Sequence, residues 1–363
     1  MHGSYDGRIA LRLPSPADLD AGAPAAGVNL DIHGFRAGLH GWPEVIEQVG
    51  LDFAWFLEPK PAAPPEISVF AENTEPDFGR FGPVRASFVT PRNVVHQHGR
   101  LTIIDYFGRG LSIYDRDTGT LTVQSRNEHL VHEAIYHFVL SQAGAALEAR
   151  GLVRLHALGL LADGGGIALM MPSGGGKSTM ALRALRDDRV RLYSEDSPLL
   201  DRRGRLHPFP LRLGVNPDDA DSLPPGPTRR MERMEFHPKL LLELEAFADR
   251  VAESPAELRH LVIGRRTLGN DAALEPIPRR AAVGALLREV VVGVGLYQGM
   301  EFVLQRGLRD AVKQLGPGAN RAACCVAALR GASVWALTLG RDRDANWRAL
   351  QPLLEGRLLA GRS

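Results

Sequence analysis

The segment from Gly166 to Thr179 constrains the fold of this 363-residue chain more than any other part of the sequence. An apolar run that predicts a strand leads into a turn with three consecutive glycines, and Lys177-Ser178-Thr179 then opens a helical stretch. Glycine lets backbone amides surround a phosphate without Cβ clashes, and the helix that follows directs its positive dipole end at the same anion. Strand, glycine-rich loop, Lys-Ser and helix in this order are typical of a P-loop, which predicts an α/β fold.

The side chains of this loop predict how it binds a nucleotide. Lys177 has the length to reach the β- and γ-phosphates, and the Ser178 hydroxyl is a ligand for Mg²⁺. Met171 stands where the usual pattern begins with glycine, whereas the rest of the pattern is present. We therefore expect ATP and Mg²⁺ as cofactors, with the nucleotide held by Ser173, Gly174, Gly175, Gly176, Lys177, Ser178 and Thr179.

Two adjacent acids follow the next predicted strand. Residues 189–193 form that strand, and Glu195 and Asp196 come directly after it. If the strand lies beside the P-loop strand, its carboxyl end reaches the phosphates. Asp196 then suits Mg²⁺ binding together with Ser178, and Glu195 suits proton abstraction from an attacking hydroxyl. The alternative is a pair of solvated acids that begin a turn.

These motifs together resemble a known family. Leu155-His156-Ala157, the segment from Ser173 to Thr179, and Ser194-Glu195-Asp196 are similar to the motifs of the bacterial HPr kinase/phosphorylase family. The similarity is greater to its shorter HPr-kinase-related members, including those of lasso-peptide gene clusters. Two departures are a Glu where the family has the first of two Asp residues, and one inserted residue before the pair.

The resemblance implies a P-loop kinase core of the HPr kinase and phosphoenolpyruvate carboxykinase type. It implies transfer of the γ-phosphoryl group of ATP to a serine-type hydroxyl of a peptide or small protein. Carried over residue by residue, it makes Glu195 the general base, Asp196 the metal-associated acid, and His156 a catalytic neighbour of the acids, beside Lys177 and Ser178. It also makes a homo-oligomer plausible, whereas the phosphorylase activity is not implied, because the C-terminal motif of that activity is not clear here.

The remaining chain divides by pattern into an accessory region and the kinase-like domain. We expect an N-terminal α+β accessory region over 1–127, for partner or substrate recognition, and the P-loop kinase domain over 128–363. Apolar residues at helical spacing predict a helix over about 128–149, with Asn127 as its N-cap. The predicted strands of the accessory region are Arg8–Leu13, Gly27–Ile32, Ile67–Phe70 and an antiparallel meander of Leu101–Tyr106, Leu111–Tyr114 and Leu121–Val123.

Composition excludes several other classes of protein. The formal net charge is only +1, which does not indicate a nucleic-acid binder, and no apolar run is long enough for a membrane span. The two adjacent cysteines, Cys324 and Cys325, fit a reducing cytoplasm and are expected to be buried.

Phosphoryl transfer also needs positive charge around the transferred group, but the sequence does not show which cations supply it. Arg212, Lys239, Arg265 and Arg266 are the candidates, and the stretch 218–235 is expected to be a mobile loop. Two other functions stay open: a kinase for a small hydroxyl compound, and a non-catalytic ATP-binding module in regulation or assembly.

Overall fold

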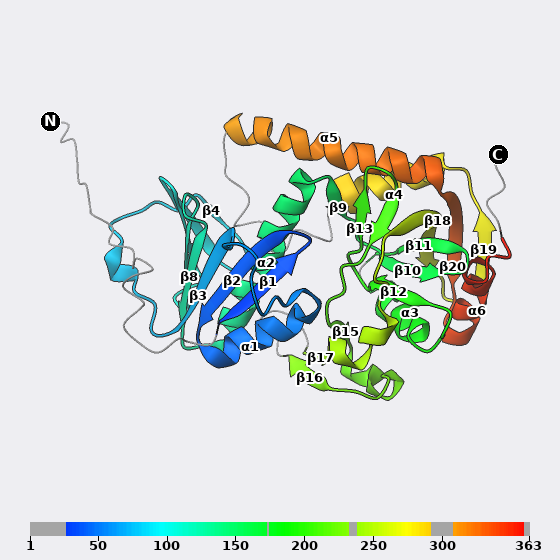
Figure 1. Cartoon of the computed structure of the whole chain (residues 1–363), viewed down its shortest axis with the longest axis horizontal. Coiled ribbons are helices and arrows are strands. Elements are labelled where there is room, and N and C mark those ends of the chain that lie inside the picture. The colour runs from blue at the N-terminus through cyan, green and yellow to red at the C-terminus, as the bar shows by residue number, and fades with distance from the viewer. Residues whose placement is uncertain (1–26, 173, 232–237, 292–307, 359–363) are drawn as a thin grey trace. The chain divides into compact units, whose positions relative to one another are not determined.

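The chain is a mixed α/β protein that forms two compact units (Figure 1). In this computed structural model, the structure describes residues 27–172, 174–231, 238–291 and 308–358. Within them, the first unit comprises 27–50 and 56–139, and the second comprises 51–55 and 140–358. The expected boundary at 127/128 lies at the start of a helix that begins in the first unit and ends in the second. The predicted strand Arg8–Leu13 lies outside the described residues.

The first unit is built on an eight-stranded sheet with the order β1-β2-β3-β8-β7-β6-β5-β4. Strands β2, β3 and β8 are parallel to one another, and the other neighbours pair antiparallel. Helix α1 connects β2 to β3. From residue 28 to residue 125 the elements are β1 Val28–Ile32, β2 Phe35–Gly41, α1 Pro43–Asp52, the 3₁₀ turn Ala54–Phe56, β3 Ile67–Asn73, the 3₁₀ turn Phe78–Arg80, β4 Phe88–Val89, β5 Val94–His98, β6 Leu101–Asp105, β7 Leu111–Asp115 and β8 Thr120–Ser125. All of them belong to the first unit except residues 51–55, at the end of α1 and in the first 3₁₀ turn.

The sequence predictions for this region are confirmed where the chain is described. The meander is β6, β7 and β8, paired antiparallel in sequence order. The predicted helix is α2, Glu128–Ala149, and the Asn127 side chain accepts a hydrogen bond from the amide of Leu130 at 3.0 Å. The first half of α2 packs on the sheet, where the ring of Phe138 lies edge-on to Tyr114 at a centroid distance of 4.8 Å.

The second unit contains a nine-stranded sheet and a smaller three-stranded sheet. The larger sheet runs β12-β10-β11-β18-β14-β13-β9, and β20 pairs with β18 and with β19. Its elements are β9 Leu152–Arg154, β10 Leu158–Ala162, β11 Gly165–Met170, α3 Lys177–Ala184, β12 Arg191–Ser194, β13 Leu199–Asp201, β14 Arg205–His207, β18 Ala256–Arg266, β19 Ala273–Pro276, α4 Arg280–Leu286, the π-helical turn Leu287–Val291, α5 Leu308–Gly331, β20 Ser333–Leu339 and α6 Arg343–Leu354.

Helices cover this sheet on both faces because its central strands are apolar on both sides. One buried cluster joins β10, β11 and β20 to α3 and α6, through residues such as Ala181, Leu337 and Leu350. The other cluster joins Ala168 and Val334 to α4 and α5, where both cysteines lie. Cys324 and Cys325 are buried as expected, and burial raises the pKa of their thiols to about 11 and about 12. Among the described residues, no helix is long and apolar enough to cross a membrane.

Part of the stretch that the sequence predicts to be a mobile loop belongs to the three-stranded sheet. It has the order β15-β17-β16, with β15 Leu213–Val215, β16 Thr228–Met231 and β17 Lys239–Leu242. Residues Pro217–Ser222, Leu244–Ala246 and Ala248–Arg250 form 3₁₀ turns, whereas 232–237 lie outside the described residues. The prediction of a loop over 218–235 is therefore wrong at β16, since Arg229 and Arg230 pair with β17.

A buried ion cluster ties residue 52 to this small sheet. The Asp52 side chain is fully buried and lies 2.8 Å from Arg212 Nε and 2.5 Å from Arg229 Nη2. Arg229 also donates from Nε to Glu243 at 2.9 Å. The nearby residues Ala54 and Trp55 pack against the α3–α6 cluster of the second unit. Residues 51–55 are thus part of the second unit although the chain on both sides of them belongs to the first.

We expect Asp52→Ala to destabilise the protein by about 3–5 kcal/mol, because it leaves two largely buried guanidinium groups without their shared carboxylate. Urea unfolding of the full chain measures this change in the free energy of unfolding. Glu253→Ala removes an exposed carboxylate and serves as the control, with a change within about 0.5 kcal/mol. Equal effects of the two substitutions would show that the Asp52 cluster does not stabilise the fold.

Candidate functional site

The predicted site residues meet at one edge of the large sheet. β11 is parallel to β18, and β18 is parallel to β20. β12 and β11 both pair antiparallel with β10, so β12 runs in the same direction as β11. The carboxyl ends of β11, β12, β18 and β20 therefore lie at the same edge. In open α/β sheets, this is the edge where ligands bind.

The loop after β11 has the backbone that its three glycines predict. Gly174 and Gly176 have φ values of 73° and 108°, in the left-handed region that favours glycine. A Cβ at Gly175 would lie 2.7 Å from the carbonyl oxygen of Pro172. Each of the three positions thus requires glycine, for conformation or for space. Ser173 lies outside the described residues.

Met171, the departure from the usual P-loop pattern, is accommodated by a glycine on the neighbouring strand. A Cβ at Gly264 of β18 would lie 2.4 Å from Cγ of Met171. The Met171 side chain therefore occupies space that a larger residue on β18 would take. Its backbone carbonyl also serves the site, because it accepts a hydrogen bond from Lys177 Nζ at 3.0 Å.

Lys177 is the most connected side chain of the site. It is only 6% exposed, and its Nζ lies 3.0 Å from Met171 O, 2.8 Å from His156 Nε2 and 3.2 Å from Asp196 Oδ1. The structure thus brings together three of the predicted catalytic residues. Lys177 begins α3, His156 lies just before β10, and Asp196 lies just after β12. A buried ammonium group needs its charge paired and its three N–H donors satisfied, and these three contacts do both.

The carboxylate of Glu289 extends this cluster, and its role was not predicted from the sequence. Glu289 is 6% exposed, and its Oε2 lies 2.6 Å from His156 Nδ1. It sits in a π-helical turn, a geometry that recurs at functional sites. The available signal was a single acid inside an apolar run, but Glu289 lies 133 residues from His156, so no spacing rule could join them.

The ring of His156 is held from both nitrogens. Nδ1 donates to Glu289, whereas Nε2 accepts from Lys177 in the neutral ring and donates to Asp196 Oδ1, 3.1 Å away, in the protonated ring. Desolvation of the ring opposes protonation, but hydrogen bonding to Asp196 and the charge of that carboxylate outweigh it and raise the pKa of His156. The same contacts, with the charge of Lys177, outweigh desolvation of Asp196 and lower its pKa.

The two acids have different partners. Asp196 contacts Lys177 and His156, whereas Glu195 Oε1 accepts a hydrogen bond from Ser178 Oγ at 2.6 Å. Burial and the adjacent negative charge of Asp196 raise the pKa of Glu195. The expected pairing for a metal, Ser178 with Asp196, is therefore not the contact that the structure shows; Ser178 contacts the other acid.

The oxygen donors present suit Mg²⁺ but do not form a complete protein cage. No group of three or more His, Cys, Asp or Glu side chains that could hold a metal occurs in the described part of the chain. Mg²⁺ typically takes one or two carboxylates and completes its shell with water and substrate phosphates. Ser178, Glu195 and Asp196 beside the glycine loop match that need, and the side chain of Asp196 is still 45% exposed.

The four candidate cations divide into three groups. Arg212 is buried in the ion cluster with Asp52, so its guanidinium group has a structural role. Lys239 lies at the start of β17. Burial raises the pKa of Glu195, and the nearby positive charge of Lys239 opposes part of that rise. Arg265 and Arg266 end β18, and Arg266 lines a small cavity beside Gly175 and Gly176.

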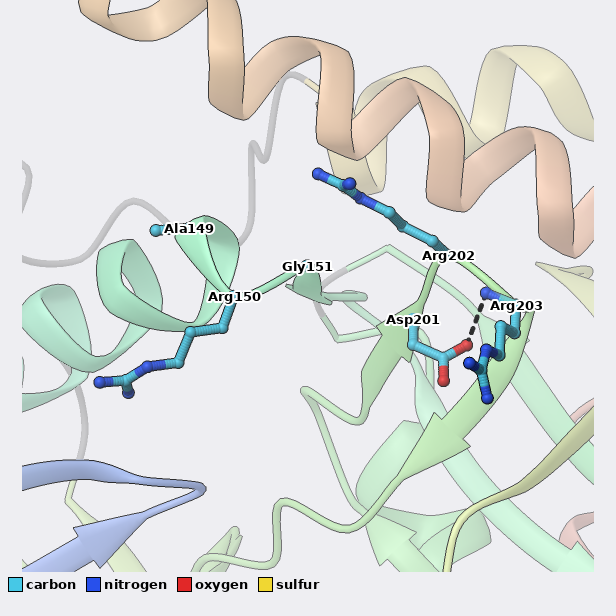
Figure 2. A pocket seen from close by; sticks show the side chains of 6 residues that line it. All are labelled: Ala149, Arg150, Gly151, Asp201, Arg202 and Arg203. Atoms are coloured by element: carbon cyan, nitrogen blue, oxygen red, sulfur yellow. Dashed lines mark hydrogen bonds between the residues drawn. The ribbon is translucent and has the colours of Figure 1, made fainter.

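A second cavity, of about 240 Å³, lies where β9 begins and β13 ends. β9 leads to His156 and β13 follows Asp196, so the cavity lies at the ends of these two strands that are far from His156 and Asp196. Figure 2 shows that the side chains of Arg202 and Arg203 on its wall extend in different directions. Asp201 accepts hydrogen bonds from the Arg203 amide at 2.8 Å and from Arg205, and Arg202 donates to Asn320. These groups are engaged with the protein and do not converge on a common point.

We expect Glu289→Ala to destabilise the protein by about 1–3 kcal/mol, because the buried Nδ1 of His156 loses its acceptor. Glu289→Gln keeps an acceptor oxygen and should cost less. Chemical denaturation measures both changes. Arg288→Ala is the control: Arg288 is 61% exposed and contacts the other oxygen of Glu289, so its loss should change stability by no more than about 0.5 kcal/mol. A larger effect of Arg288→Ala than of Glu289→Ala would contradict the assignment of Glu289 as the support of His156.

The comparisons with known proteins add no name to this site. No protein-family model matches the chain, and no curated protein matches it.

Proposed function

We propose that this protein is an ATP- and Mg²⁺-dependent kinase that transfers the γ-phosphoryl group to a serine-type hydroxyl of a peptide or small protein. One observation supports this most strongly. The lysine and serine of a glycine-built phosphate loop each contact a different member of an adjacent carboxylate pair. A site for nucleotide binding alone needs the loop, whereas two carboxylates at its end provide for a metal and for a proton acceptor.

The proposal includes the fold of the second unit. A P-loop after β11, an acid pair after the parallel strand β12, and a histidine that leads into β10 agree with a kinase core of the HPr kinase and phosphoenolpyruvate carboxykinase type. The sequence resemblance and this strand arrangement are separate arguments for the same proposal. The first unit then serves partner or substrate recognition.

In the proposed reaction, the acceptor oxygen forms a bond to the γ-phosphorus while the bond from phosphorus to the β,γ-bridging oxygen breaks. The hydroxyl proton passes to the carboxylate of Glu195, and ADP departs with the electron pair of the broken bond. Lys177 and the loop amides hold the phosphates throughout. Mg²⁺, when bound, neutralises charge on the β- and γ-phosphate oxygens.

The surrounding side chains fix these groups in place. Glu289 orients the His156 ring, and His156 with Lys177 holds Asp196 at the edge of the site. Lys239 brings positive charge to the side of Glu195. In the proposed assignment, Ser178 and Asp196 would hold Mg²⁺, and the Ser178 hydroxyl would then give up its hydrogen bond to Glu195.

The first test identifies the activity and the acceptor together. We expect γ-labelled ATP with Mg²⁺ and a size-fractionated host lysate to transfer label to a peptide or protein fraction. Lys177→Met should abolish the transfer, because it removes the ammonium group and keeps the side-chain volume. Lys60→Ala, at an exposed lysine of the first unit, is the matched control and should label normally.

Other outcomes of this test contradict specific parts of the proposal. Label in small metabolites would replace the peptide acceptor with a small hydroxyl compound. Nucleotide binding without any transfer would favour a non-catalytic module over a kinase. Equal labelling by Lys177→Met and the wild type would remove the P-loop from the mechanism.

A second prediction separates the two carboxylates. We expect Glu195→Gln to lower kcat by about 10²–10⁴-fold without changing the Mg²⁺ concentration needed for half-maximal rate. Asp196→Asn should raise that Mg²⁺ concentration by about tenfold or more, because it removes a charged ligand. Mg²⁺ titrations of the phosphoryl-transfer rate measure both. The reverse pattern would exchange the two roles, in agreement with the Ser178–Glu195 contact.

A further inference from the structure

A third cavity, of about 440 Å³, lies at the carboxyl end of α3, the helix that begins with Lys177. Its wall is formed by Arg183 of α3, by the turn from residue 186 to residue 189, and by Trp347 of α6. Helix α3 has eight residues and is roughly 12 Å long, so it separates the cavity from the glycine loop at its other end. Among the described residues, none lines both this cavity and the small cavity beside the glycine loop.

Trp347 brings a hydrogen-bond donor without a partner to the wall of this cavity. The residue is only 9% exposed, and its ring packs in the buried cluster of α3 and α6. In the part of the chain that the structure describes, no group accepts a hydrogen bond from its Nε1–H, whereas the indole of Trp335 donates to His260 Nδ1 at 3.2 Å. A buried indole N–H usually has an acceptor. Because the exposed part of Trp347 lines the cavity, a ligand there can supply the missing acceptor.

Most charged side chains of the wall are already neutralised by a neighbour. Both oxygens of the Asp187 carboxylate accept hydrogen bonds from Arg189, at 3.0 Å and 2.8 Å. Two other wall residues have ion-pair partners outside the wall: Asp188 pairs with Arg250, and Arg183 pairs with Asp344. These four wall residues therefore leave little charge for a ligand.

Arg186 is the exception on this wall. Its side chain is exposed and donates from Nη2 to the carbonyl oxygen of Ser222 at 2.7 Å. No carboxylate among the described residues forms an ion pair with it. A guanidinium group has five N–H donors, so most of those of Arg186 are left for a ligand.

The charge of the wall selects the kind of anion. Three arginines and two aspartates line the cavity, which leaves one net positive charge. A carboxylate carries one negative charge and matches it, whereas a phosphate dianion would be repelled by the two aspartates. The planar fork of a guanidinium group also suits the two oxygens of a carboxylate.

We infer that this cavity is a second ligand site of the protein, for an organic monocarboxylate whose carboxylate group binds Arg186 and the Nε1–H of Trp347. The inference does not depend on the proposed kinase activity. The cavity has the size of a small-molecule pocket, about 300–1,000 Å³, so the ligand has a larger uncharged body beside its carboxylate. That carboxylate belongs either to a small organic acid or to the C-terminus of a peptide, which present the same chemistry.

The test follows the indole N–H signals of the four tryptophans by ¹H–¹⁵N NMR of the full-length protein. Trp347→Phe removes one signal and thereby assigns it. We expect benzoate to shift the Trp347 signal in a saturable way, and benzamide, which has the same shape without the charge, to bind about tenfold more weakly or less. Acetyl-alanyl-alanine and its C-terminal amide test the peptide source in the same way. The carboxylate that binds more tightly identifies the source.

Two substitutions measure the contributions of the named groups. Arg186→Gln should weaken binding of the tighter carboxylate by about tenfold or more, because it removes a charge-assisted hydrogen bond. Arg330→Gln is the matched control, at an exposed arginine in the last turn of α5 that does not line the cavity, and should change the affinity by less than about twofold. Trp347→Phe, measured by isothermal titration, should weaken binding by about two- to tenfold. Circular dichroism of each variant checks the fold, and Arg186 is exposed, so its substitution tests the site even if Trp347→Phe unfolds.

The opposite results overturn the inference in distinguishable ways. A Trp347 signal that neither carboxylate moves shows that the cavity does not bind this class of ligand. Equal affinities of Arg186→Gln and the wild type remove the guanidinium group from the site. Inorganic phosphate that binds as tightly as benzoate contradicts the selection for a single negative charge. None of these results bears on phosphoryl transfer, which the labelling experiment tests separately.

Discussion

The buried ammonium group of Lys177 is the constraint on which the site depends. A positive charge that is only 6% exposed must be surrounded by acceptors, and here they come from three different parts of the second unit. The carbonyl of Met171 comes from the end of β11, His156 from the segment before β10, and Asp196 from the segment after β12. Glu289 then holds His156 from a fourth segment. The contacts that pair the charge of Lys177 thus bring four segments of the chain together.

How much of this could be predicted from the sequence depends on the sequence separation of the partners. The three glycines, Lys177 and Ser178 act within one turn of each other, so their spacing alone predicts the loop. Glu195 and Asp196 follow the next strand, and the ordinary geometry of α/β sheets places them at the same edge. The helix α2 was predictable for the same reason, because its periodicity and its Asn127 cap are local.

The errors and omissions involve contacts between distant segments. Glu289 meets His156 across 133 residues, and Arg343 of α6 lines the same small cavity as Gly175 and Gly176. The sequence predicts a loop at β16 because Pro224, Pro225 and Pro227 break any local pattern before it. That strand exists because β17 pairs with it and because Asp52 neutralises Arg229. Both causes are tertiary, and neither is visible in the residues of β16 themselves.

The position of Asp52 has a consequence for how the chain is made. Its contact with Arg229 spans 177 residues, so this carboxylate leaves the ribosome long before the guanidinium group that neutralises it. The sheet of the first unit can pair its strands early in synthesis, since they all lie before residue 126. The segment 51–55 cannot make its final contacts until the small sheet of the second unit has been synthesised. Long-range contacts of this kind form slowly and leave intermediates exposed, so the second unit can complete its folding only after Arg229 has been synthesised.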